Sequence, residues 1–131
     1  MSYIEYSDIT DSVVRAFGET TVTPYITKSD YQVNDVAEQL GITDTDQIET
    51  DPVHFKIKEY AIAYVGREVC MDKMGMNNNN LPVEIEKYAV KYKLYREKVL
   101  ALRKELSLPM FNGTVDQAKD RATYVGTFYR T

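Results

Sequence analysis

The sequence predicts an all-α protein, an elongated helical bundle built on a long antiparallel helical hairpin. Three observations support this class. The chain has 131 residues, one domain's length, with 44% hydrophobic and 27% charged residues, as in soluble globular chains. Apolar residues recur every three or four positions through most of it. The breaks between these segments hold the caps, glycines and prolines that start and end helices. We therefore expect a helical bundle domain over residues 1–109 and an extended arm over 110–131.

A short first helix is predicted near the N-terminus. Ser7 or Asp8 can cap it, and Gly18 ends it. Residues 19–27 contain four threonines and Pro24, a residue that removes a backbone donor and breaks a helix interior. The pattern favours an extended connector over residues 19–27.

A second short helix follows the connector. Ser29 and Gln32 have the spacing of a capping box, and Gly41 supplies the exit. Residues 42–50 are mostly threonines and acids and are expected to form a surface loop with at most one helical turn. The loop lacks the glycine and glutamate positions of an EF-hand, so we predict no metal site there.

A long helix is predicted to begin at Asp51 and Pro52, a cap followed by a ring suited to the first helical position. Its apolar residues repeat every three or four positions until Gly75. Residues 75–81, which include four asparagines, form a polar connector. A connector of this length is typical of antiparallel neighbouring helices, so the next helix should fold back on this one.

The second long helix, over residues 82–106, has the clearest pattern in the chain. Its apolar residues alternate at spacings of three and four over three heptads, and Pro109 is expected to end the helix soon afterwards. We predict that this stripe packs along its whole length, with Tyr92 at its centre. The predicted core stripe comprises Ile85, Tyr88, Tyr92, Tyr95, Val99 and Leu102, continued by Leu106.

Charge is divided unevenly along the chain. Residues 1–51 hold eleven acids against two bases, whereas the remaining residues hold fourteen bases against nine acids. Such segregation indicates contact between copies of the chain or with a partner, although two solvated faces of unlike sign would also produce it. We expect the acidic segment of one copy to meet a basic face of the next, formed by Lys91, Arg96 and Lys98.

The residues that could support catalysis are few. His54 is the only histidine and falls in a predicted first helical turn, and Cys70 lies among apolar neighbours, where a thiol is inert. No phosphate loop, dinucleotide fingerprint or metal-ligand spacing is present. We predict no enzyme activity, no catalytic or metal site and no cofactor. The interleaved tyrosines of the basic helix could stack on bases, but their heptad register favours core packing, and a nucleic-acid-binding regulator is the less favoured alternative.

No run of apolar residues approaches the length of a membrane-spanning helix, so no membrane contact is expected.

After an Asn-Gly turn, the sequence favours a further short helix and then an extended arm. This arm has too much apolar surface to stay in water, and we predict that it docks on another chain by strand addition, although it could instead fold back on its own hairpin. Its predicted anchors are Tyr124, Val125, Phe128, Tyr129 and Arg130.

The order of these elements resembles a known family. An acidic loop leads into a long helix that contains Tyr60, Ala61, Tyr64 and Val65; a polar connector follows, then a second long helix of the form Lys-Tyr-x-x-Tyr and a C-terminal extension. Over roughly residues 7–108 this arrangement resembles the head-tail connector proteins of tailed bacteriophages, and more narrowly the adaptor that docks beneath the portal ring.

The resemblance implies a structural virion protein. Such adaptors assemble as a ring under the portal, extend the channel through which DNA leaves the capsid, and contact the portal, neighbouring copies and a downstream tail or neck protein. It further implies synthesis in the host cytoplasm, a place in the virion neck, and passage of DNA without sequence-specific binding. The alternatives are another neck or tail-completion protein, or a small helical module that binds a protein partner.

Overall fold

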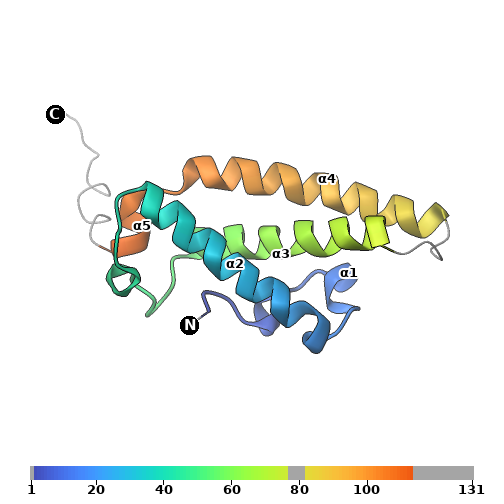
Figure 1. The fold of residues 1–131 in the computed structure, drawn as a ribbon, viewed down its shortest axis with the longest axis horizontal. Helices are drawn as coiled ribbons and strands as arrows, with labels where there is room; N and C mark the ends of the chain where they lie inside the picture. Colours follow the sequence, from blue (N-terminus) through green and yellow to red (C-terminus); the bar gives the residue numbers. More distant parts are fainter. Residues whose placement is uncertain (1, 77–81, 114–131) are drawn as a thin grey trace.

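A computed structural model describes residues 2–76 and 82–113 of the chain, and within these ranges the protein is all-α, as predicted, with no β-strand. Figure 1 shows the helices gathered along two long, neighbouring rods. The elements are the 3₁₀ turn η1 (Tyr6–Asp8), α1 (Ser12–Arg15), α2 (Glu19–Gln39), the 3₁₀ turn η2 (Thr45–Gln47), α3 (Phe55–Met76), α4 (Pro82–Glu105) and α5 (Leu108–Asn112).

The two long helices α3 and α4 lie side by side and run in opposite directions (Figure 1). The Lys56 ammonium at the start of α3 contacts the Glu105 carboxylate at the end of α4 at 2.5 Å. One turn further along α3, the Tyr60 hydroxyl accepts a hydrogen bond from Arg103 at 3.4 Å. The helix α2 crosses α3 on another side, so α3 is covered by both α2 and α4.

Gly66 sets how closely α3 and α4 approach at their middle. Its position is buried against the ring of Tyr95, and a Cβ atom there would lie 2.5 Å from the ring carbons. Real Cβ atoms do not come this close to carbon, so only glycine lets the ring of Tyr95 pack flat on α3. An isolated glycine inside a helix usually has such a packing reason.

We expect Gly66→Ala to destabilise the protein by about 1–2 kcal/mol. Alanine normally favours a helix over glycine by about 1 kcal/mol, but overpacking a closed contact costs about 1–3 kcal/mol. Urea unfolding of both proteins measures the difference. In a Tyr95→Ala background the clash is absent, so there the same change should be neutral or stabilising. A stabilising effect in the wild-type background would contradict the close contact.

The predicted core stripe of α4 is buried in its second half. Tyr95, Val99, Leu102 and Leu106 are buried, whereas Tyr88 and Tyr92 are partly buried and pack against the core. The prediction that Tyr92 is the buried centre is therefore wrong, and Tyr95 has this role. Tyr95 is covered by α3 and also by the N-terminal segment, which meets its hydroxyl. The side chain of Ile85 lies outside the described part of the chain.

The helix α2 replaces the connector and the second short helix that the sequence predicted. It is continuous through Pro24 and begins after Gly18, whose φ of 86° suits glycine. One face of α2 is apolar at helical spacing on both sides of the proline, and burying this face outweighs the lost backbone hydrogen bond. The buried residues of this face are Val22, Ile26, Ser29, Val33, Val36 and Ala37.

Hydroxyl side chains of α2 bond within the helix instead of capping it. Thr23 donates to the Glu19 carbonyl at 2.7 Å, and Ser29 donates to the Ile26 carbonyl at 2.6 Å. The predicted capping box at Ser29 is therefore wrong, because Ser29 lies in mid-helix and is fully buried. A serine hydroxyl can donate its hydrogen bond to a carbonyl of the preceding helical turn, so a serine alone does not mark the start of a helix.

The helix α3 begins later than predicted. The Asp51–Pro52 peptide is cis and lies in the turn before the helix, and α3 starts at Phe55. His54 provides the cap: its carbonyl accepts from the Lys58 amide at 3.1 Å, and its Nδ1 atom accepts from the Lys56 amide at 3.1 Å. The loop before it agrees with the prediction, with one turn of helix, η2.

The core continues beyond the predicted bundle. The helix α4 ends at Glu105, and Pro109 lies in the first turn of α5 instead of ending α4. Phe111 of α5 is fully buried, and its carbonyl accepts from the Glu49 amide at 2.6 Å. The core therefore extends past residue 109, where the sequence predicted the bundle domain to end, because α5 packs on α3 and on the loop.

Candidate interaction surface

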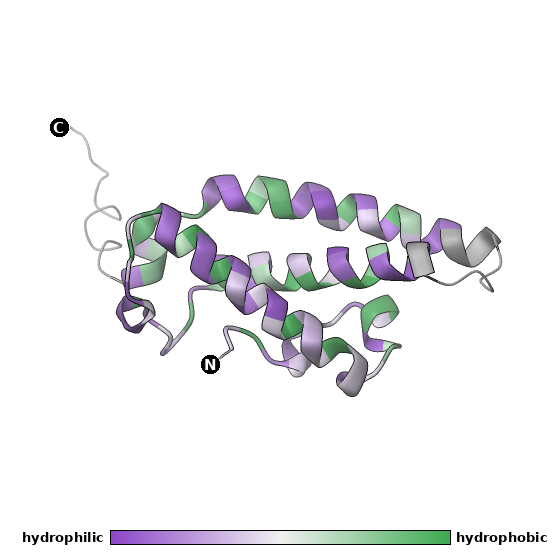
Figure 2. Ribbon diagram, viewed as in Figure 1, coloured by the Kyte–Doolittle hydropathy of each residue, from purple (hydrophilic) through white to green (hydrophobic). Residues whose placement is uncertain are grey.

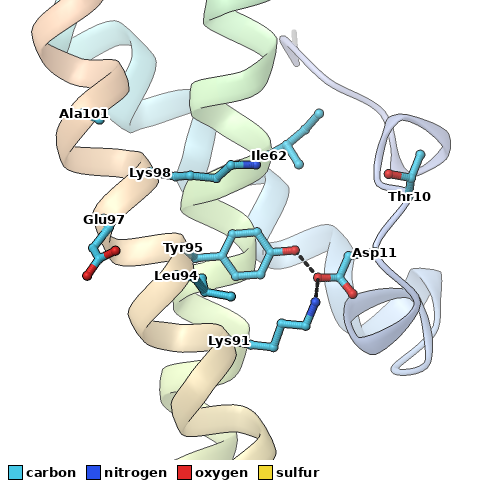
Figure 3. A pocket seen from close by; sticks show the side chains of 9 residues that line it. All are labelled: Thr10, Asp11, Ile62, Lys91, Leu94, Tyr95, Glu97, Lys98 and Ala101. Atoms are coloured by element: carbon cyan, nitrogen blue, oxygen red, sulfur yellow. Dashed lines mark hydrogen bonds and ion pairs between the residues drawn. The ribbon is translucent and has the colours of Figure 1, made fainter.

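The N-terminal segment is held on α4 by one carboxylate. Asp11 caps α1 by accepting from the Val13 amide at 2.9 Å. The same side chain accepts a hydrogen bond from the Tyr95 hydroxyl and another from Lys91 Nζ at 3.1 Å, as Figure 3 shows. Three donors from two distant parts of the sequence therefore converge on Asp11, which makes this side chain a tertiary anchor.

The proton affinities of this cluster follow from its contacts. Burial by itself would raise the pKa of Asp11, but the hydrogen bonds from Tyr95, Val13 and Lys91 outweigh it and hold the pKa below its ordinary value. Burial and the hydrogen bond to Asp11 both raise the pKa of Tyr95. Near neutral pH the cluster therefore pairs a carboxylate, Asp11, with a neutral phenol, Tyr95.

The other residues considered for catalysis have structural surroundings. Cys70 is fully buried, and burial together with the negative charge of Asp11 raises its pKa to about 11, so the thiol stays protonated. His54 is the cap of α3. Across residues 2–76 and 82–113, no group of three or more histidine, cysteine or acidic side chains is placed to hold a metal ion.

We expect Asp11→Asn to destabilise the protein by about 1 kcal/mol at pH 7, because asparagine keeps the helix cap but loses the charge that strengthens the hydrogen bonds. The folded-state pKa of Asp11 lies below its unfolded value, so its contribution is complete above about pH 5 and is lost as pH falls through the folded pKa. Unfolding free energies measured from pH 7 down to about pH 3 should show the gap between the two proteins narrowing at the acid end. A gap independent of pH would contradict a charged anchor.

A groove opens beside this anchor, between α4, α3 and the N-terminal segment (Figure 3). Its volume is about 570 Å³. The Lys98 side chain extends across it toward Ile62 of α3, while Leu94 forms part of its apolar wall. The lining residues are Thr10, Asp11, Ile62, Lys91, Leu94, Tyr95, Glu97, Lys98 and Ala101.

The side of α4 that faces away from the core is also apolar in part. Val90, Leu94 and Leu100 have exposed fractions of 56%, 54% and 52%. Figure 2 shows hydrophobic and hydrophilic residues interleaved along the whole visible length of α4. A helix with apolar residues on both sides is typically covered on both sides. We call this surface the outer face of α4 and define it by its exposed residues Val90, Lys93, Leu94, Arg96, Glu97, Leu100 and Lys104.

The predicted basic face is divided by the fold. Lys91 is paired with Asp11 of its own chain, whereas Arg96 and Lys98 are exposed and make no ion pair within the described residues. Two further ion pairs join the acidic N-terminal segment to later bases, Asp8 with Lys58 at 3.8 Å and Asp35 with Arg103 at 3.4 Å. Some acids of the N-terminal segment therefore pair with later bases of the same chain, and not with a second copy.

An acidic groove lies where α2 meets the loop that follows it. Its volume is about 310 Å³. Tyr31 and Glu38 both line this groove, and 67% of the surface of Tyr31 is exposed. Asp46 of η2 is exposed beside the groove. We call this the α2 groove; it is lined by Tyr31, Asn34, Asp35, Glu38, Ile42, Thr43 and Thr45.

Sequence reasoning missed the residues on which the site is built. Asp11 precedes two valines, a cap signal that could have been noticed, but its partners on α4 lie 80 and 84 residues away. Gly66 was recognisable as an isolated glycine in a helical pattern. The predicted arm anchors, Tyr124 to Arg130, lie outside the described residues.

Comparison of the chain with protein families, with curated proteins and with solved structures finds no match. None of the helices in the described ranges combines the length and apolar character needed to cross a membrane.

Proposed function

We propose that the chain is a head-tail connector of a tailed bacteriophage, a structural protein that forms a ring beneath the portal and extends the DNA exit channel. The observation that carries this proposal is the outer face of α4, where Val90, Leu94 and Leu100 are each more than half exposed. An apolar and basic face of this kind favours a partner surface over a solvated one.

The chemistry of the described residues also supports an assembly role. The Asp11 carboxylate is occupied by Tyr95, Lys91 and the Val13 amide and ties the N-terminal segment to α4. Cys70 is buried and protonated. The remaining charges lie mainly on exposed helix faces, where they can direct how proteins meet.

The triple variant Val90→Ser, Leu94→Ser, Leu100→Ser tests the proposal. These side chains are exposed, so the melting temperature should stay within a few degrees of wild type. Assembly of copies into a ring on the portal protein of the same virus, measured by co-sedimentation and electron microscopy, should be lost.

Met71→Ser is the matched control, since Met71 is an exposed apolar residue on α3 outside this face. It should bind like wild type. A wild-type chain that neither binds the portal nor forms rings on it would contradict the connector function. Normal ring assembly by the triple variant would show that the outer face of α4 has no part in that function.

The C-terminal arm is proposed to dock on another chain, the portal, a neighbouring copy or a downstream neck protein. The test is a truncation after Gly113, because Phe111 is part of the core and a cut before it would unfold the end of the bundle. We expect the truncated protein to melt at the wild-type temperature and to lose co-sedimentation with its partner. A large fall in melting temperature would instead show that the arm covers its own bundle.

A further inference from the structure

We propose that the outer face of α4 docks on the α2 groove of a second copy of this chain. The inference rests on the proposed connector function and deepens it, because it assigns the two faces through which neighbouring copies meet. Each face combines exposed apolar surface with unpaired charge, and the two charges are of opposite sign.

On α4, the centre of the contact is Leu100. It is 52% exposed, with Arg96 one helical turn before it and Lys104 one turn after it. Lys93 lies two turns before Leu100 on the same side. None of these three bases makes an ion pair within the described residues, and all are exposed. Leu100 therefore has three available bases near it, together with one exposed acid, Glu97, three residues before it.

On α2, the corresponding centre is Tyr31. Its exposed fraction of 67% is the largest among the exposed large apolar residues of the described chain. It borders a concave surface of about 310 Å³, with Glu38 in the wall and Asp46 beside it. Both acids are exposed and unpaired within the part of the chain that the structure covers. Aromatic residues are enriched at interface centres, and tyrosine contributes large area with little entropy loss.

A second copy of the chain offers a complementary surface to each face. The outer face of α4 against itself would bring Arg96, Lys104 and Lys93 against like charges, which costs free energy. Contact between the outer face of one copy and the α2 groove of the next instead places the bases of α4 near Glu38 and Asp46. The same contact places Leu100 near Tyr31. Because the two faces belong to different helices that both pack on α3, the contact is heterologous, and repeating it forms a ring when the rotation closes.

Two charge-reversal variants of the full chain test this pairing. The α4 variant carries Arg96→Glu and Lys104→Glu; the α2 variant carries Glu38→Lys and Asp46→Lys. Sedimentation velocity over a range of protein concentrations at low salt measures self-association without the portal. We expect wild type to associate, and each variant alone to bind itself at least about tenfold more weakly, since every contact then joins like charges.

A one-to-one mixture of the two variants should recover association to within about threefold of wild type, because each mixed contact again joins unlike charges. Lys28→Glu reverses an exposed base on α2 and serves as the control, with no weakening expected. A wild-type chain that stays monomeric, an α2 variant that associates like wild type, or a mixture that is not rescued would overturn the proposal. These readings use no portal, so failure here is separate from failure of portal binding.

Discussion

The ring of Tyr95 is the contact on which the rest of the structure depends. One side of it lies on the bare backbone of Gly66, which fixes the approach of α3 and α4. Its hydroxyl meets Asp11, which caps α1 and so ties the N-terminal segment to α4. Lys91, one turn before Tyr95, completes the anchor. One side chain thus joins the long helix pair to the N-terminal segment, through a partly buried network in which Asp11 accepts from Tyr95, Lys91 and the Val13 amide.

The fold sorts the charges of the chain into two groups. Asp8, Asp11 and Asp35 neutralise later bases within the monomer. The Asp8 and Asp35 pairs are the more exposed ones and add little stability individually, so their main effect is to orient the N-terminal elements against α3 and α4. Other charges make no ion pair within the described residues, and some of them lie beside the exposed leucines of α4 or beside Tyr31 of α2. A monomer that leaves such faces uncovered is suited to assembly, the role we propose for it.

The all-α class and the second long helix could be predicted from sequence because they depend on local periodicity, which survives in α4 from Pro82 to Glu105. The N-terminal third could not, because Pro24 and the threonines oppose a helix locally, and only burial of Val22, Ile26 and Val33 against the body overrides them. The same limit applies to the site. Lys91 has the sequence context of a surface base, and only the tertiary fold brings it to Asp11. Tyr92 and Tyr95 both belong to the heptad stripe, and only the tertiary contacts of Tyr95 with Gly66 and Asp11 distinguish them.

The most direct test of this account is a double-mutant cycle between Asp11→Ala and Tyr95→Phe. The second change removes the hydroxyl and keeps the ring on Gly66, so the cycle isolates the bond that joins the N-terminal segment to the helix pair. Free energies of unfolding for wild type, both single variants and the double variant should show a coupling of about 1–3 kcal/mol, as expected for residues in one hydrogen-bonded network. Additive effects, within about 0.3 kcal/mol, would contradict the central role of Tyr95.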